Sequence, residues 1–388
     1  MAYLFNNLNI TKISVIGAGQ IGPDIALHFA KSLYPYDIKI INLDISPTAL
    51  ESAKNKAWKK ILKDTEKGIL TADESERIKS SLIYSSNYES VRGSQIVVEA
   101  ATENENIKDS IFRQVEQLTD ASCIYLSNSS HMQPEIIFRN IKNKSRCLVA
   151  HYFFPADRNP VVEIVPSEKT DNGITCLLLE FYKSIGKHPI KVKSSYGYAI
   201  DPIFEGLCET AILCLEKGWG NEKQIDKIAC ETLGLGVGPF TALNFTGGNP
   251  ITAHGLDEMG KQLMPWFKTP ELLHEAVKNK TQWAIAGREE NIEVPDALKE
   301  KLSFEFLGAY FSLCSYIMDR NIIAINDLDQ ACKLSLVVKA PFTMMNEMGI
   351  LKSLHLVELF CARHSNFAIP QSIAAAFKMG QWNMNHEV

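Results

Sequence analysis

The chain has 388 residues, of which 46% are hydrophobic and 22% charged, and its formal net charge is −5 at pH 7. This ordinary globular composition excludes a disordered or collagen-like protein, and the acidic balance argues against nucleic acid as a partner. The apolar runs are far shorter than the roughly 20 residues that cross a bilayer, so no membrane span is expected. A domain of about 150 residues is usual, so the length predicts two or three domains.

The nine cysteines are scattered and form no Cys-x-x-Cys pair. This odd, unpaired set predicts reduced thiols and a cytoplasmic location rather than a disulfide framework or a zinc ribbon. The N-terminus lacks the basic and apolar regions of a signal peptide. No His-Glu-x-x-His or similar cluster is present, so no metal site is expected.

Short β-rich runs alternate with helical patterns through the first half of the chain. Strands are predicted at 13–16, 37–43, 95–99, 122–126 and 146–150. Helices are predicted after the glycines that begin at Gly17, after Ser46-Pro47, where serine caps and proline opens a helix, and after Thr71, which begins a capping-box pattern. This alternation predicts a parallel, doubly wound α/β sheet of the Rossmann type over residues 1–193.

A glycine motif lies between the first strand and the first helix. It fits Gly-x-Gly-x-x-Gly in the run Gly17-Ala18-Gly19-Gln20-Ile21-Gly22. The first glycine permits a tight turn, the second lets the backbone approach a pyrophosphate, and the third lets helix and sheet pack closely. The free amides of the helix start would face the phosphates. The strand before it and the helix after it make this a dinucleotide site rather than a chance match.

The cofactor is predicted from the acid that ends the second strand. Asp44 stands in the expected place, about 20 residues after the motif. Its carboxylate would accept hydrogen bonds from ribose hydroxyls and repel a 2′-phosphate, so NAD is favoured over NADP. FAD, or a glycine turn without any nucleotide, remains an alternative.

Polar residues at the ends of later strands are the catalytic candidates. Ser127-Asn128-Ser129-Ser130 follows the strand at 122–126, and His151 follows the strand at 146–150. Both therefore lie at the carboxyl edge of the sheet, where ligands bind. Glu163 follows within the run 161–165. A histidine paired with a carboxylate is a common general base, although a lone histidine is more often structural.

The second half is dominated by helical patterns and contains an internal repeat. Leu215 to Asn244 and Met318 to Asn346 share an aspartate, a cysteine and a Pro-Phe-Thr run, about 100 residues apart. We interpret them as two copies of one helical unit that pack on each other. The charged, proline-bearing segment 286–300 is a predicted linker. The predicted domains are therefore an α/β Rossmann domain at 1–193 and an all-α region with related helical domains at 194–292 and 293–388.

These motifs together resemble the L-3-hydroxyacyl-CoA dehydrogenase family. The matching runs are Val15 to Gly22, Val98 to Asn104, Ser127 to Ser130, His151 to Pro155, Val162-Glu163 and Gly238 to Phe240. They occur in the order of the family and nearly at its spacing across residues 10–250. The later repeat resembles the helical domain of the same family, as in fused fatty-acid oxidation proteins. The resemblance therefore covers most of the chain.

The resemblance implies roles for individual residues. His151 matches the general base that removes the 3-hydroxyl proton, Glu163 the acid that orients it, and Ser130 the hydroxyl that hydrogen-bonds the reacting oxygen. Glu103, Lys108 and Asn128 match residues on the cofactor side. Ser130 could instead be only a helix cap, and Glu163 only a strand-edge residue. Ser130 lacks the Gly-x-Ser-x-Gly surroundings of an acyl-transfer nucleophile.

The chain departs from the family pattern at the candidate site. Phe154 stands where the family has asparagine after the histidine, Asp201 stands where it has a catalytic-site asparagine, and Pro202 replaces an arginine. An ionised aspartate can only accept hydrogen bonds. Near His151 it would raise the imidazole pKa and oppose negative charge on a substrate oxygen. Asp201 is therefore protonated, points elsewhere, or serves a substrate other than a straight-chain acyl-CoA.

The helix after the second strand carries a run of lysines. The run includes Lys54 and Lys60 and lies, by resemblance, near the 3′-phosphate of CoA. Lys54 and Lys60 are therefore candidates for contact with CoA, and the alternative is that the run is only a solvated face.

The resemblance implies NAD-dependent oxidation of a (S)-3-hydroxyacyl-CoA to the 3-oxoacyl-CoA, or the reverse, in fatty-acid β-oxidation. One alternative is a related dehydrogenase whose hydroxy acid is not bound to CoA. Another is a nucleotide-binding sensor with altered catalysis, an idea motivated by Asp201 and Phe154. Family members form dimers through the helical domain, and a duplicated copy can replace that partner internally. The chain is therefore expected to be a monomer or a homodimer.

Overall fold

The computed structural model describes residues 3–6, 8–245 and 248–384. The chain forms two compact units, Met1–Ser194 and Ser195–Val388. Each is described by itself below. No helix among the described residues is both long and apolar enough to cross a membrane.

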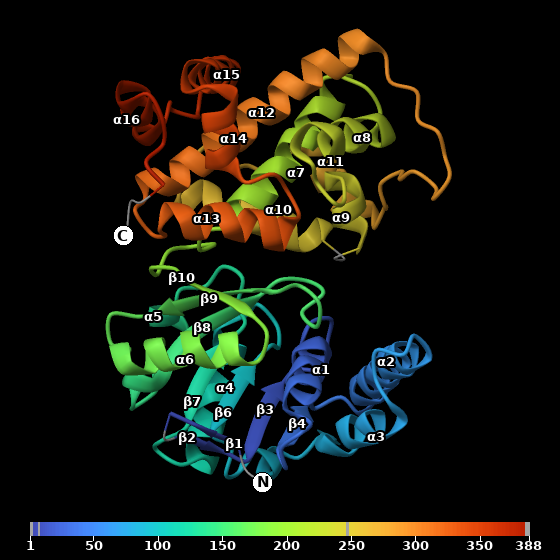
Figure 1. Cartoon of the computed structure of the whole chain (residues 1–388), viewed down its shortest axis with the longest axis vertical. Helices are drawn as coiled ribbons and strands as arrows, with labels where there is room; N and C mark the ends of the chain where they lie inside the picture. Colours follow the sequence, from blue (N-terminus) through green and yellow to red (C-terminus); the bar gives the residue numbers. More distant parts are fainter. Residues whose placement is uncertain (1–2, 7, 246–247, 385–388) are drawn as a thin grey trace. The chain divides into compact units, whose positions relative to one another are not determined.

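The first unit is an α/β domain (Figure 1). Its strands are β1 (Tyr3–Phe5), β2 (Leu8–Ile10), β3 (Lys12–Ile16), β4 (Lys39–Leu43), β5 (Leu82–Ser85), β6 (Ile96–Glu99), β7 (Ile124–Ser127), β8 (Cys147–Tyr152), β9 (Val161–Pro166) and β10 (His188–Lys191). Its helices are α1 (Gly22–Leu33), α2 (Pro47–Glu66), α3 (Ala72–Ser81), α4 (Glu105–Leu118), α5 (Pro134–Ile137) and α6 (Asn172–Ser184), with 3-10 turns η1 (Tyr88–Val91) and η2 (Lys144–Arg146).

The predicted elements are present, with ends that differ by one to a few residues. Ser46 caps α2 by accepting the amide of Ala49 at 3.2 Å, and Thr71 and Glu74 form the capping box of α3. The hairpin β1–β2 and the strands β5 and β10 are additions that the sequence patterns did not predict. All of them are three or four residues long, which is too short for a periodic signal.

The main sheet has the strand order β10-β9-β8-β7-β6-β3-β4-β5. The pairs from β8 to β5 are parallel as predicted, but β8 and β9 are antiparallel. The segment 153–160 between them is too short for a crossover helix, so the chain turns back as a hairpin. This reversal brings His151 directly opposite Glu163.

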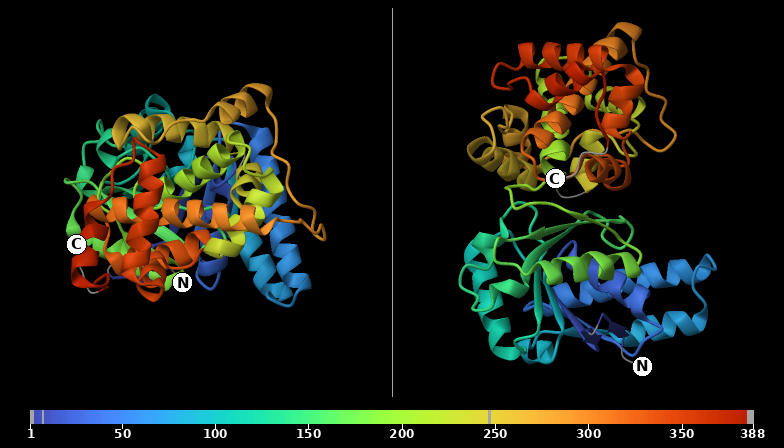
Figure 2. Two further views of the ribbon diagram at one scale, coloured as in Figure 1. Left: turned by 90° about the horizontal axis from the view of Figure 1, so that it is seen from above. Right: turned by 60° about the vertical axis from the view of Figure 1, so that its left-hand side comes forward.

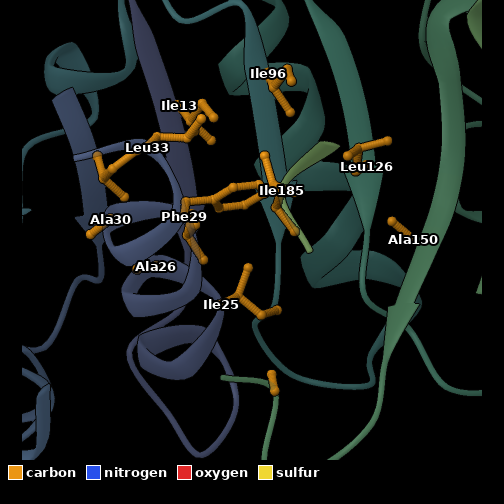
Figure 3. Packing of buried hydrophobic residues seen from close by; sticks show 14 of the residues in the cluster. Ile13, Ile25, Ala26, Phe29, Ala30, Leu33, Ile96, Leu126, Ala150 and Ile185 are labelled. Carbon is orange, nitrogen blue, oxygen red and sulfur yellow. The ribbon is translucent and has the colours of Figure 1, made fainter. Parts of the chain in front are cut away.

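Hydrophobic side chains cover both faces of this sheet. Figure 3 shows Ile25, Phe29 and Leu33 of α1 against Ile13 and Leu126 of the strands. Successive side chains of a strand point to opposite faces. Tyr125 therefore lies on the other face, where it contacts Phe112 of α4 at 6.2 Å between ring centroids. The continuous apolar strand runs follow from this double burial.

The second unit is all-helical and is seen from two further directions in Figure 2. Its helices are α7 (Asp201–Glu216), α8 (Glu222–Leu233), α9 (Pro239–Phe245), α10 (Asn249–Gln262), α11 (Glu271–Asn279), α12 (Asp296–Asp319), α13 (Ile325–Ala331), α14 (Pro341–Met348), α15 (Ile350–Arg363) and α16 (Gln371–Met379), with a π-helical turn η3 (Cys332–Leu336). The predicted linker at 286–300 is irregular only up to Pro295, since α12 begins at Asp296.

The internal repeat is confirmed by equivalent side-chain contacts. In the first copy Asp226 accepts the Phe240 amide at 2.8 Å, and Phe240 packs on Trp283 at 5.0 Å between ring centroids. In the second copy Asp329, Phe342 and Trp382 make the same contacts, at 2.8 and 4.6 Å. Asn244 and Asn346 likewise exchange two hydrogen bonds with the backbones of Trp283 and Trp382.

The two copies pack on each other within one compact unit. The long helix α12 contacts α7 and α8 of the first copy as well as α15 and α16 of its own (Figure 1). Within the second copy, Gly308 of α12 permits the close approach of α15, because a Cβ there would lie 2.9 Å from the Leu356 carbonyl oxygen. The division of this unit at residue 292 stays a prediction.

Candidate active site

The glycine turn joins the central strand β3 to α1. Gly17 has a φ of +111°, and a Cβ there would lie 2.3 Å from the Ala100 carbonyl oxygen. A Cβ on Gly22 would lie 2.1 Å from the Gly17 carbonyl oxygen. A Cβ on Gly19 would meet no protein atom within 4 Å. Internal packing therefore requires the first and third glycines, whereas the second leaves open space beside the backbone, which fits the pyrophosphate of a dinucleotide.

The remaining residues of the motif lead into α1. Gln20 is exposed, and its carbonyl oxygen accepts a hydrogen bond from Lys56 Nζ at 3.0 Å. The Ile21 carbonyl oxygen accepts the amides of Asp24 and Ile25 at 3.0 and 3.1 Å, which begins the helix. The first amides of a helix lack intrahelical partners and carry its positive dipole end, so they suit a phosphate.

Asp44 follows β4 and is fixed beside this turn. One carboxylate oxygen accepts the Ala18 amide at 2.7 Å, and the other accepts the Ser46 amide at 2.8 Å. The side chain is half-buried. Its remaining lone pairs can accept further hydrogen bonds, and its predicted contact with the ribose hydroxyls stays a prediction.

A buried charge network lies at the end of the neighbouring strand β6. Lys108, which is 1% exposed, donates to both carboxylate oxygens of Glu99 at 2.9 Å and lies 3.2 Å from Glu103. Glu99 also accepts the hydroxyl of Ser127 at 2.6 Å. Burial opposes the lysine charge, but the two carboxylates outweigh it and raise the pKa of Lys108. Burial likewise opposes the charge of Glu103, yet Lys108 holds the pKa of that carboxyl below its usual value.

The serine run after β7 is bonded into this network. Ser129 donates its hydroxyl to Glu103 and accepts the Met132 amide at 2.9 Å. Asn128 accepts the Tyr152 amide at 2.9 Å and so joins the end of β7 to β8. Ser130 is half-buried in the same turn.

His151 and Glu163 form a buried pair. They face each other across the β8–β9 ladder, with imidazole Nδ1 2.8 Å from a carboxylate oxygen. The exposed fractions of their side chains are 4% and 0%. With its proton on Nδ1, the imidazole donates to Glu163, and Nε2 is then the nitrogen that can accept a proton. The ring of Phe153 packs against His151 at 4.6 Å between centroids.

Asp201 belongs to the second unit, where it is the first residue of α7. It is half-buried. Its predicted part in the site therefore stays a prediction.

The two candidate substrate lysines of α2 make different contacts. Lys54 Nζ lies 4.4 Å from the ring centroid of Trp58 on the same helix. Lys60 Nζ instead makes two ion pairs inside the first unit, to Asp24 at 2.9 Å and to Asp157 at 2.6 Å. Its contact with CoA also stays a prediction.

Three residues of the site were not among the sequence candidates. Glu99 binds Lys108 and the hydroxyl of Ser127, which belongs to the predicted serine run, and Asp157 and Lys187 hold the turn between β8 and β9. Glu99 could have been identified from the sequence, because a charged residue at the end of an apolar strand indicates a position at the ligand-binding edge of the sheet. Nothing in the local sequence could have paired Asp157 with Lys60, which is distant along the chain.

The sheet, the glycine turn and the acid after β4 define the class: a dinucleotide-binding domain of the Rossmann type. Residues 12–195 match the sequence profile of the family described as 3-hydroxyacyl-CoA dehydrogenase, NAD binding domain. This part of the chain is similar to that family, and NAD is the cofactor of the domain. Among the described residues, no group of three or more His, Cys, Asp or Glu side chains is placed to hold a metal ion.

Similar proteins carry the same domain within longer chains. A glyoxysomal fatty acid beta-oxidation multifunctional protein of Cucumis sativus is 30% identical over 238 residues, which are 61% of this chain and 32% of that protein. A fatty acid oxidation complex subunit alpha of Shewanella amazonensis is 29% identical over 262 residues, which are 67% of this chain and 36% of that protein. The chain thus spans about a third of the length of these relatives.

A solved structure of similar fold covers nearly the whole chain. The 3-hydroxybutyryl-CoA dehydrogenase of Escherichia coli has a TM-score of 0.84 at 18% identity and covers 96% of this chain and 99% of its own. At this identity the likeness concerns the fold, and it includes the helical second unit.

Proposed function

We propose that the protein is an NAD-dependent 3-hydroxyacyl-CoA dehydrogenase that converts a (S)-3-hydroxyacyl-CoA to the 3-oxoacyl-CoA, or the reverse. The observation that carries the proposal is the buried pair of His151 and Glu163 in the same sheet as the NAD turn. The family of residues 12–195 and the names of the relatives support the substrate class.

The side chains divide the work of the reaction. His151 accepts the proton of the 3-hydroxyl group on Nε2, and Glu163 orients the imidazole and stabilises its charged form. Ser130 donates a hydrogen bond to the reacting oxygen. Bound NAD supplies the hydride acceptor.

The cofactor is held by the turn and the polar residues around it. The turn residues Gly17, Gly19, Gln20, Ile21 and Gly22 receive the pyrophosphate. Asp44 accepts the ribose hydroxyls. We assign Glu103, Lys108 and Asn128 to the cofactor side of the site.

A panel of substrates tests the function. The full chain is mixed with NADH and acetoacetyl-CoA, longer 3-oxoacyl-CoAs or cyclic analogues, and absorbance is followed at about 340 nm, where NADH absorbs. Oxidation of NADH with any thioester supports the proposal. Activity with hydroxy acids that lack CoA, without any thioester activity or thermal stabilisation by CoA, would favour the related dehydrogenase instead.

The cofactor preference depends on Asp44. Asp44→Asn removes the negative charge but keeps the shape. Charge-assisted hydrogen bonds are worth about 1.5–3 kcal/mol, so KM for NAD should rise roughly tenfold or more. The ratio of kcat/KM for NAD over NADP should fall, because the repulsion of a 2′-phosphate is removed. An unchanged ratio would place the adenosine ribose elsewhere.

The aspartate at the start of α7 affects catalysis if it faces the substrate. Asp201→Asn turns an acceptor into a potential donor. One donor aimed at developing negative charge is worth roughly 100-fold in kcat, so we expect turnover or acyl preference to change by at least about tenfold. Measurement of kcat and KM for several acyl-CoAs checks this, and identical values in both proteins would show that Asp201 lies outside the active site.

We also propose a reducing, cytoplasmic location. All nine cysteines are free, and Cys176 is exposed.

The duplicated helical unit supports a monomer, since α12 already packs the second copy onto the first. Sedimentation of the purified chain would separate this from a homodimer.

A further inference from the structure

The turn 153–160 links the strands that carry His151 and Glu163. Antiparallel register depends on the turn that joins two strands, and a slip of one residue moves a side chain to the other face of the sheet. Because the two residues are direct partners across the ladder, whatever holds this turn also holds the pair.

Lys187 holds the turn from the side of β10. It is 6% exposed, and its ammonium donates to the carbonyl oxygens of Ala156 and Asn159, both at 2.6 Å. Ala156 is fully buried. Buried carbonyl groups need a donor, and here one side chain supplies donors to two carbonyl groups of the turn.

A chain of ion pairs holds the same turn from the side of α1 and α2. The Asp157 side chain is 1% exposed and lies 2.6 Å from Lys60. Lys60 lies 2.9 Å from Asp24, and Asp24 lies 3.1 Å from Lys56. Lys56 in turn donates to the Gln20 carbonyl oxygen of the glycine turn. The β8–β9 turn and the glycine turn are therefore connected through α2.

We propose that Lys187 and the chain Asp24–Lys60–Asp157 form a clamp that positions the pair His151–Glu163. These are positioning residues, since they act through the turn rather than on substrate. The catalytic consequence rests on the proposed function, whereas the positioning itself does not. The clamp also gives Lys60 a role inside the protein that differs from the predicted contact with CoA.

The charge of Lys187 is also sensitive to its burial in the clamp. Burial lowers its pKa to about 8, against the attraction of Asp157. His28 of α1 faces it, and burial holds the pKa of that imidazole well below its usual value. Tyr152 of β8, whose ring centroid is 5.5 Å from Nζ, and Tyr182 of α6 stay neutral because burial raises their pKa.

Deprotonation of Lys187 with rising pH should therefore lower kcat but raise the free energy of unfolding. Above pH of about 8 the folded protein loses the Lys187 charge, so its hydrogen bonds weaken and kcat should fall. Between about 8 and the ordinary pKa of 10.5 the unfolded chain binds more protons, so this group makes the free energy of unfolding rise. In Lys187→Met, kcat should no longer fall above a pH of about 8. Its value at lower pH should be below that of wild type.

The test compares Asp157→Asn, Lys60→Met and the double variant with wild type. Hydrogen exchange of the peptide around 152–161 reports the turn, and the downfield proton of His151 Nδ1 reports the pair. We expect faster exchange confined to this peptide, a shifted or lost proton resonance and kcat lower by roughly ten- to hundredfold. KM for NAD should stay within about twofold of the wild-type value. The kcat of the double variant should be no lower than that of the more impaired single variant, because both changes break the same contact.

A matched control exists in the same domain. Lys31 and Asp64 also join α1 to α2, at 2.6 Å, but do not touch the turn. Lys31→Met with Asp64→Asn should leave exchange at 152–161, the proton resonance and kcat unchanged. Asp157→Glu, which keeps the charge, should restore part of the lost rate.

The outcomes separate the clamp from the proposed function. Unchanged exchange and an unchanged His151 resonance in Asp157→Asn and Lys60→Met overturn the clamp, as does faster exchange spread over the whole chain. If wild type oxidises no hydroxyacyl substrate, the proposed function fails. The clamp then still stands or falls on exchange and resonance, which need no substrate.

Discussion

Replacement of His151 by glutamine should reduce kcat by about 10³, within the range of roughly 10²–10⁴ for a lost general base. Glutamine can hydrogen-bond Glu163 but has no nitrogen that takes up a proton near neutral pH. KM for NAD should change little, because the imidazole contributes to proton transfer rather than to cofactor binding. Steady-state kinetics with a 3-hydroxyacyl-CoA, read by NADH absorbance, measures both parameters.

Two variants bracket this result. Glu163→Gln keeps the shape of the side chain but removes the charge that stabilises the imidazolium. It should lower kcat by roughly ten- to hundredfold, which is less than the loss in His151→Gln. His274→Gln, at an exposed position of the second unit, should have no effect. A kcat for His151→Gln within about threefold of wild type would exclude His151 as the base.

Loss of Lys108 should have the largest effect on stability. Lys108→Met removes the cation that both oxygens of Glu99 bind at 2.9 Å. The fully buried Glu99 carboxylate then keeps only neutral donors. Removal of one partner of a buried ion pair costs about 3–5 kcal/mol, so urea unfolding should show a free energy of unfolding lower by that amount.

The double variant Glu99→Gln with Lys108→Met shows whether the stability lost in Lys108→Met is due to the unpaired charge of Glu99 or to the altered packing of residue 108. It buries no unpaired charge, so it should regain most of the lost stability, since neutral replacement of a buried pair is often harmless. No recovery would mean that packing, and not the charge, makes Lys108 necessary. Binding of NAD should be weaker than in wild type in both the single and the double variant, because Glu103 lacks its cation in each.

The pH dependence of this network follows from its pKa values. The carboxylates raise the pKa of Lys108, so its contribution to stability is present below 10.5 and is lost as pH rises through the raised value. The pKa of Glu103 is lowered, so its contribution is present above its ordinary value and is lost as pH falls through the lowered one. Comparison of Lys108→Met with wild type across pH isolates the first effect.

The sequence alone predicted the local parts of the site. The glycine turn, Asp44 and the strand ends are determined by residue type and short-range spacing, because a turn, a cap or a buried strand depends on neighbours in the chain. The repeat was also readable, and equivalent contacts at Asp226 and Asp329 confirm it. The roles of Ser130, His151 and Glu163 came from resemblance, since spacing alone left them open.

Only the tertiary structure decided which side chains meet. No sequence pattern indicates that β9 runs antiparallel to β8, although that reversal sets His151 opposite Glu163. Lys60 belongs to a run that looks solvated, yet it is paired with Asp24 and Asp157. Lys187 reaches a turn that lies about 30 residues earlier. Ion pairs and buried donors depend on distance in space, and distant segments approach each other only when the sheet and its helices have formed.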